Sequence, residues 1–86
     1  MKMLLPFRGG YAIVYPEANY QGRGMRVSEG LPNYDVGSVK IPQGQEQWYA
    51  FTQPGYKGKG YALNPGKGYR NLEGVDIDSM LPAEDL

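Results

Sequence analysis

The side chains that could do chemistry in this chain are almost all oxygen donors. None of the 86 residues is Cys or His, which excludes disulfides, thiolate zinc sites, imidazole metal ligands and every catalytic arrangement that needs a His base. Nine carboxylates remain, but no spacing between them places two in one cleft as a general acid and base. The composition therefore predicts that the protein is not an enzyme. Any bound metal is expected to be a hard cation such as Ca²⁺, held by oxygen atoms.

Charge and hydropathy exclude further classes of partner. Nine basic side chains balance nine acidic ones, which argues against nucleic acid. No apolar run approaches the roughly 20 residues of a membrane helix, and the opening residues 1–10, MKMLLPFRGG, do not make a signal peptide. We therefore expect a cytoplasmic monomer or homodimer without membrane contact. Leu4, Leu5 and Phe7 either support oligomerisation or cover one end of the core.

The elements that must position these oxygen donors are short β-strands. Gly contributes 13 residues and Pro 7, and both disfavour helix interiors. Between them lie short segments rich in Tyr, Val, Ile and Phe, at 11–15, 25–27, 38–41, 48–51 and 61–63. Short strands separated by turn residues predict an all-β sandwich or barrel. The stretch 71–80 is either a turn or a short final strand.

An aromatic–glycine pattern occurs twice. Residues 15–22 read YPEANYQG and residues 51–58 read FTQPGYKG, with an offset of 36 at each fixed position (51−15, 56−20, 58−22). In each copy we expect the second aromatic ring to pack on the first across a folded hairpin, and the glycine to adopt a positive φ angle. The fixed positions are Tyr15, Tyr20 and Gly22 in the first copy and Phe51, Tyr56 and Gly58 in the second.

A second pair of segments follows in the same order. Residues 35–39, DVGSV, match residues 76–80, DIDSM, with an offset of 41 (76−35). Two matched segments in one order predict two copies of one supersecondary unit, each too short to be a stable domain alone.

The two patterns resemble the Greek key motif of the βγ-crystallin family, and Trp48 stands where a tryptophan commonly opens the second motif. The resemblance covers nearly the whole chain. It implies one domain, residues 1–86, with Greek keys at about 11–42 and 47–82. It also implies a β-sandwich of two four-stranded sheets, in which one strand of each motif crosses into the sheet of the other.

The same resemblance raises the question of calcium. Many microbial members of the family bind Ca²⁺ through Asn/Asp, Asn/Asp, two free residues, Ser/Thr and Ser, once in each motif. The corresponding segments here, NYDVGS at 33–38 and GVDIDS at 74–79, both depart from that pattern. Gly37 replaces a hydroxyl ligand in the first segment, and Asp78 offers a carboxylate in its place in the second. The candidate ligands are Asp78, Asp76, Asp35, Ser38 and Ser79.

Two interpretations of these residues stay open. Either one weakly bound calcium ion is held by the aspartates and loop carbonyls, or no ion binds and the aspartates are solvated turn formers. Likewise, the function is either that of a non-enzymatic structural or stress-type protein, or that of a binding module such as a toxin, inhibitor or host-directed factor. The basic and aromatic stretches 56–61 and 66–70 could form a platform for bases or sugars. They equally fit a hairpin with a soluble edge.

Overall fold

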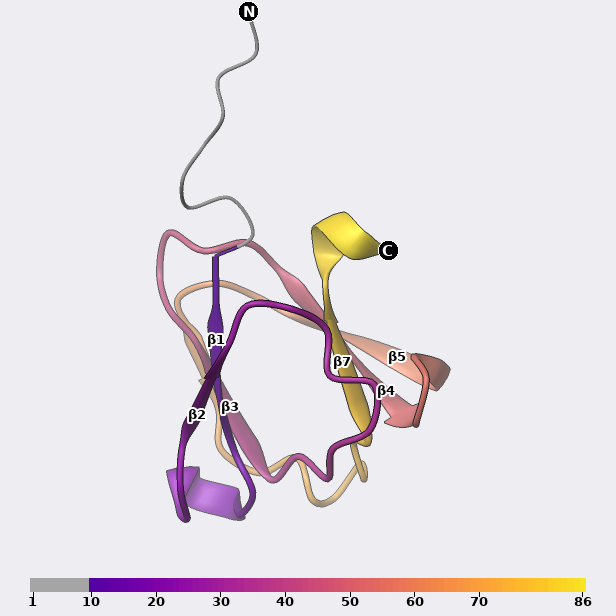
Figure 1. The fold of residues 1–86 in the computed structure, drawn as a ribbon. Helices are drawn as coiled ribbons and strands as arrows, with labels where there is room; N and C mark the ends of the chain where they lie inside the picture. Colours follow the sequence, from indigo (N-terminus) through magenta and orange to yellow (C-terminus); the bar gives the residue numbers. More distant parts are fainter. Residues whose placement is uncertain (1–9) are drawn as a thin grey trace, which may run out of the picture.

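The computed structural model describes residues 10–86, and the predictions made for Leu4, Leu5 and Phe7 lie outside that range. Residues 10–86 form seven strands. The prediction of an all-β fold is confirmed, as the ribbon in Figure 1 shows. Within residues 10–86, none of the helices has the length and apolar character needed to cross a membrane. The strands are β1 (Ala12–Tyr15), β2 (Met25–Val27), β3 (Ser38–Ile41), β4 (Trp48–Gln53), β5 (Lys57–Leu63), β6 (Lys67–Tyr69) and β7 (Ser79–Pro82), and the two short 3₁₀ helices are η1 (Ala18–Tyr20) and η2 (Ala83–Asp85).

The strands pair antiparallel in two sheets that exchange segments between the halves of the chain. The first sheet has the order β2-β1-β3-β6, so a strand from the second half completes it. The second sheet has the order β5-β4-β7, and Leu31 of the first half joins its edge through an isolated antiparallel bridge to Met80. Because each half contributes to the sheet of the other, neither half can form its sheet alone.

The fourth strand expected in the second sheet is reduced to that bridge. Leu31 and Met80 exchange both backbone hydrogen bonds, at 2.8 and 3.0 Å. A regular antiparallel ladder would next pair Asn33 with Asp78, but it is the Tyr34 N–H that donates to the Asp78 carbonyl, at 2.8 Å, so the register slips by one residue. The ladder therefore stops after one residue.

The core lies between the two sheets and follows the alternation of the strands. On β1, Ala12 and Val14 are fully buried while Ile13 and Tyr15 are half-buried, as expected when one face of a strand meets the core. Trp48 at the start of β4 has no exposed surface. The other buried core residues are Val27, Val36, Val39, Ile41, Ala50, Phe51, Leu63, Ile77 and Met80.

Both folded hairpins make the contacts expected from their spacing. The rings of Tyr15 and Tyr20 lie 5.6 Å apart at 62°, and those of Phe51 and Tyr56 lie 6.2 Å apart at 67°. Both pairs have the edge-to-face geometry that aromatic quadrupoles favour. The glycine that ends each pattern has a positive φ angle, as do Tyr20 and Tyr56.

Candidate metal centre

Two loops that are far apart in the sequence are joined at the end of the sandwich. Val36 and Ile77 form an isolated antiparallel bridge, and the Val36 N–H donates to the Ile77 carbonyl at 3.0 Å. The Tyr34 N–H donates to the Asp78 carbonyl at 2.8 Å. Val36 and Ile77 are buried in the core, at 1% and 0% exposure. In extended backbone the neighbouring residues point the other way, so Asp35 and Asp78 face outward.

Three aspartates from these loops converge. The carboxylates of Asp35, Asp76 and Asp78 each offer an oxygen that lies within 4.8 Å of the others. Asp35 and Asp76 are exposed, and Asp78 is half-buried. The structure thus brings together, from both halves of the chain, three of the five residues expected as metal ligands.

The backbone of the second loop holds its two aspartates firmly. Asp76 has a φ angle of 56°, a left-handed conformation that Asp tolerates better than most residues. Its N–H donates to the carbonyls of Leu72 and Glu73 at 3.0 and 3.2 Å, which closes a tight turn. The Asp78 N–H donates to the Phe51 carbonyl at 2.9 Å, which fixes this end of the loop to β4.

The three carboxylates carry like charges close together. No residue in the range 10–86 forms an ion pair with Asp35, Asp76 or Asp78. Two unit charges 4.8 Å apart repel by about 0.9 kcal/mol in water, and salt weakens this repulsion. A bound cation would remove it.

The spacing of the oxygens suits a calcium ion. Two oxygens on one Ca²⁺, each at 2.3–2.6 Å, can lie up to about 5 Å apart, so a spread of at most 4.8 Å fits within one coordination sphere. Three carboxylates supply between three and six of the roughly six to eight oxygens that Ca²⁺ takes, and water or loop carbonyls would complete the set.

The two candidate serines, Ser38 and Ser79, share a role that differs from that of the aspartates. The Ser38 hydroxyl accepts from the Tyr20 N–H at 2.9 Å and donates to the Glu17 carbonyl at 2.6 Å. The Ser79 hydroxyl accepts from the Tyr56 N–H at 3.0 Å and donates to a backbone carbonyl of β4 at 2.7 Å. Both residues are completely buried. Their hydroxyls fasten the folded hairpins through hydrogen bonds to backbone groups.

The missing hydroxyl at Gly37 has a steric cause. A Cβ atom at Gly37 would lie 2.4 Å from the backbone carbonyl carbon of Glu17, a distance at which the backbone would have to move. The hairpin that Ser38 fastens therefore occupies the space of a side chain at residue 37. The first loop therefore contributes Asp35 alone to the cluster, and the second loop contributes Asp76 and Asp78.

Sequence reasoning did not single out two exposed cations of the first sheet. The Arg26 guanidinium lies 4.0 Å from the centre of the Tyr11 ring, and the Lys40 Nζ lies 4.6 Å from the centre of the Tyr20 ring. The strand alternation around each residue could have placed both on the outward face, but their proximity depends on the order of the strands in the sheet.

Comparison with known proteins identifies the fold. No protein-family model and no curated protein matches the sequence. Among solved structures, a βγ-crystallin from Ciona intestinalis is 19% identical with a TM-score of 0.70, and covers 85% of this chain and 99% of its own. An archaeal βγ-crystallin is 22% identical with a TM-score of 0.69, and it covers 84% of this chain and 95% of its own. IPSE/alpha-1 from Schistosoma mansoni eggs is 23% identical with a TM-score of 0.67, and it covers 83% of this chain and 81% of its own. The resemblance drawn from the aromatic–glycine motifs is thus confirmed, and the protein has the βγ-crystallin fold.

Proposed function

We propose that the protein is a non-enzymatic structural or stress-type protein whose fold is stabilised by one weakly bound Ca²⁺ at the three-aspartate cluster. The observation that carries this proposal is the convergence of Asp35, Asp76 and Asp78, without ion-pair partners in residues 10–86, from two loops of opposite halves. The βγ-crystallin fold is shared by structural, stress and binding proteins, so the proposal depends on this cluster and not on the fold.

The position of the cluster explains how an ion would act. Asp35 belongs to the first half of the chain, and Asp76 and Asp78 belong to the second. An ion held between them would join the two loops and remove their mutual repulsion. A ligand that binds only the folded state at 100 times its Kd stabilises that state by about 2.7 kcal/mol. This is a large share of the stability of a small domain without disulfides.

Weak binding follows from the same geometry. Two of the three carboxylates are exposed, the hydroxyls of Ser38 and Ser79 are committed to the hairpins, and Gly37 contributes no side chain. Much of the coordination sphere would therefore be water, which leaves the ion less tightly held than in a site closed by protein oxygens.

The non-enzymatic part of the proposal is supported by the surface hollows. Two hollows of the first sheet are lined by Tyr, Arg and Lys side chains and by no carboxylate. The carboxylate cluster lies on a loop surface outside both of them. Acid–base catalysis by these groups would need a cleft that also holds a substrate.

Calorimetry on chelator-stripped protein tests the proposal. We expect Ca²⁺ in the millimolar range to raise the Tm of the native protein and to give a binding isotherm. Asp78→Asn should lose both effects, while Glu29→Gln, an equal change of charge on an exposed loop residue outside the cluster, should keep them. Absence of both heat and a Tm shift with the native protein would refute calcium binding and favour the alternative, a binding module that works without Ca²⁺.

A further inference from the structure

The outward face of the first sheet carries a row of residues that cross all four strands. Ile13 on β1 stands directly opposite Arg26 on β2 and Lys40 on β3, and Lys40 stands opposite Gly68 on β6. Arg26 and Lys40 are exposed, and Ile13 is half-buried. The row therefore presents one cation on each side of an apolar residue.

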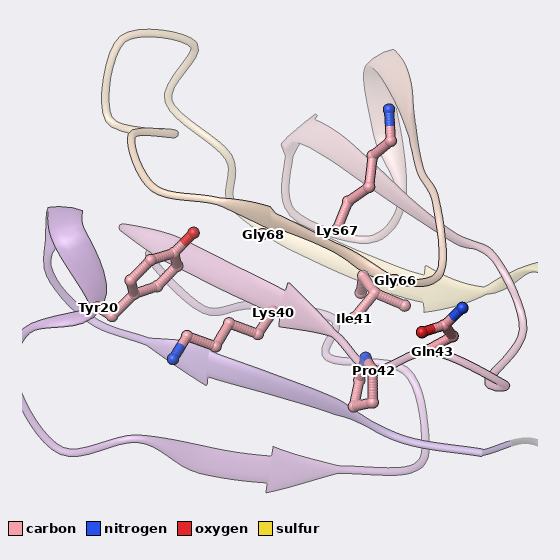
Figure 2. Close-up of a pocket in the computed structure, with 8 residues that line it drawn as sticks. All are labelled: Tyr20, Lys40, Ile41, Pro42, Gln43, Gly66, Lys67 and Gly68. Carbon is pink, nitrogen blue, oxygen red and sulfur yellow. The ribbon is translucent and has the colours of Figure 1, made fainter.

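Residues of this row line two hollows, Arg26 and Ile13 one and Lys40 and Gly68 the other. One, of about 460 Å³, is lined by Tyr11, Ile13, Tyr15, Gly24 and Arg26. The other, of about 470 Å³, contains Tyr20, Lys40, Pro42 and Gly68 (Figure 2). Both have the size of small-molecule sites. Lys40 lies between them, because its Nζ is 4.6 Å from the centre of the Tyr20 ring and 5.9 Å from that of the Tyr15 ring.

The two cations are held in place without being neutralised. Arg26 lies over the Tyr11 ring and Lys40 over the Tyr20 ring, contacts that favour one orientation of a long side chain. Neither forms an ion pair with a carboxylate within the described part of the chain. Figure 2 shows the ammonium group of Lys67, at the rim of the second hollow, pointing away from that of Lys40.

The second sheet shows that the fold does not require these charges. Tyr49, 36 residues after Ile13, stands opposite Ala62 and Leu81. Ala62 follows Arg26 by the same offset (62−26), and Leu81 follows Lys40 by the offset of the second segment (81−40). The equivalent row of the second sheet is thus uncharged.

From these observations we infer that the outward face of the first sheet binds an acidic polysaccharide, a sugar chain that carries sulfate or carboxylate groups at intervals. One strand separates Arg26 from Lys40, so their Cα atoms lie about 10 Å apart. In the structure the two cations lie over different rings, Arg26 over Tyr11 and Lys40 over Tyr20, so a ligand with anionic groups at two positions matches them better than one small anion. Such a ligand can contact both cations while its sugar rings rest on Ile13, which lies between them.

Two other polyanions fit the face less well. A nucleobase needs a free aromatic face on which to stack, but Arg26 and Lys40 lie over the faces of Tyr11 and Tyr20. An acidic peptide gains main-chain hydrogen bonds by adding to an open sheet edge, whereas this row is centred on β1 and β3, which are paired on both sides.

The test is a calorimetric titration of the full chain with a sulfated heparin-type hexasaccharide, at low salt and with a chelator present. The chelator separates this proposal from the calcium proposal. We expect binding by the native protein and a loss of affinity of about tenfold or more in Arg26→Gln/Lys40→Gln, which removes two charge-assisted contacts. The matched control Lys57→Gln/Lys59→Gln, on β5 of the second sheet, removes the same charge and should lose less than about threefold.

The melting curve followed by the fluorescence of Trp48 reports whether each variant is folded. If the glutamine pair does not fold, Arg26→Ala/Lys40→Leu places on the first sheet the residues already present at the equivalent positions of the second. Three results would overturn the proposal. They are no binding by the native protein, equal losses in the test and control variants, and equal or tighter binding of a thymidine oligonucleotide or of polyglutamate.

Discussion

Replacing Asp76 by Asn separates the repulsion within the aspartate cluster from its use in binding an ion. Asn keeps the shape of the side chain and tolerates the left-handed backbone at this residue, so the change is chiefly one of charge. Asp76 repels both Asp35 and Asp78 from within 4.8 Å. At about 0.9 kcal/mol for each pair, the variant should be more stable than the native protein by up to about 1.7 kcal/mol in chelator and low salt. At an ionic strength of 0.1 M the Debye length is about 10 Å, so the gain should shrink as salt is added.

Calcium should reverse the order of stability. The native protein gains about 2.7 kcal/mol when Ca²⁺ stands at 100 times its Kd, and the variant, which has lost one of three carboxylates, should gain little. The assay is urea unfolding followed by the fluorescence of Trp48, which is the only tryptophan and is fully buried. The shift of the urea midpoint at constant slope gives the change in stability. A variant that is less stable than the native protein in chelator would refute the electrostatic reasoning. An equal gain with and without Ca²⁺ would refute the role of Asp76 in binding.

Three further predictions concern the scaffold. Ser38→Ala and Ser79→Ala each leave one backbone N–H and one backbone carbonyl without their partner in a buried hairpin, and each should lower the free energy of unfolding by about 2–3 kcal/mol in urea titrations. A loss below about 0.5 kcal/mol would contradict their role as hairpin fasteners. Gly37→Ala should destabilise by about 1–3 kcal/mol through its clash with backbone, while Gly74→Ala, where a Cβ meets nothing within 4 Å, serves as the control and should stay within about 0.5 kcal/mol in thermal melts. Burial, aided by the charge of a nearby carboxylate, raises the pKa of Tyr56 above its usual value of 10.0. The folded state therefore favours the protonated phenol, a contribution that is present below pH 10 and is lost as pH rises through the folded pKa. Stability measured from pH 8 to 11 should fall at the alkaline end, and Tyr56→Phe should flatten that fall.

Much of the fold could be predicted because its signals are local. The spacing of Tyr15, Tyr20 and Gly22 is set by one hairpin, so ring packing and the positive φ of the glycine follow from a few neighbouring residues. The segment at 11–15 was likewise predicted as a strand, but it is apolar or aromatic throughout, and only the structure shows that Ala12 and Val14 face the core. The fourth strand expected in the second sheet is present only as the Leu31–Met80 bridge, because its length depends on how two distant segments meet in space.

The candidate site depended on tertiary structure to a greater degree. The sequence by itself limited the chemistry to oxygen donors, through the absence of Cys and His, and it pointed to Asp35, Asp76 and Asp78. Only the pairing of Val36 with Ile77 brings those carboxylates together, across about forty residues of chain. The sequence also offered Ser38 and Ser79 as ligands, whereas the folded hairpins draw both hydroxyls into the interior.

The row formed by Arg26, Ile13 and Lys40 on the first sheet also depends partly on the sequence and partly on the tertiary structure. That Arg26 and Lys40 are basic and lie in strands is written in the sequence. That both flank Ile13 is decided by the order β2-β1-β3 in the sheet. Local geometry follows from neighbouring residue types, because backbone sterics and side-chain spacing act over a few residues. Which distant side chains meet on a surface follows from strand order and register, which only the packing of the whole core determines.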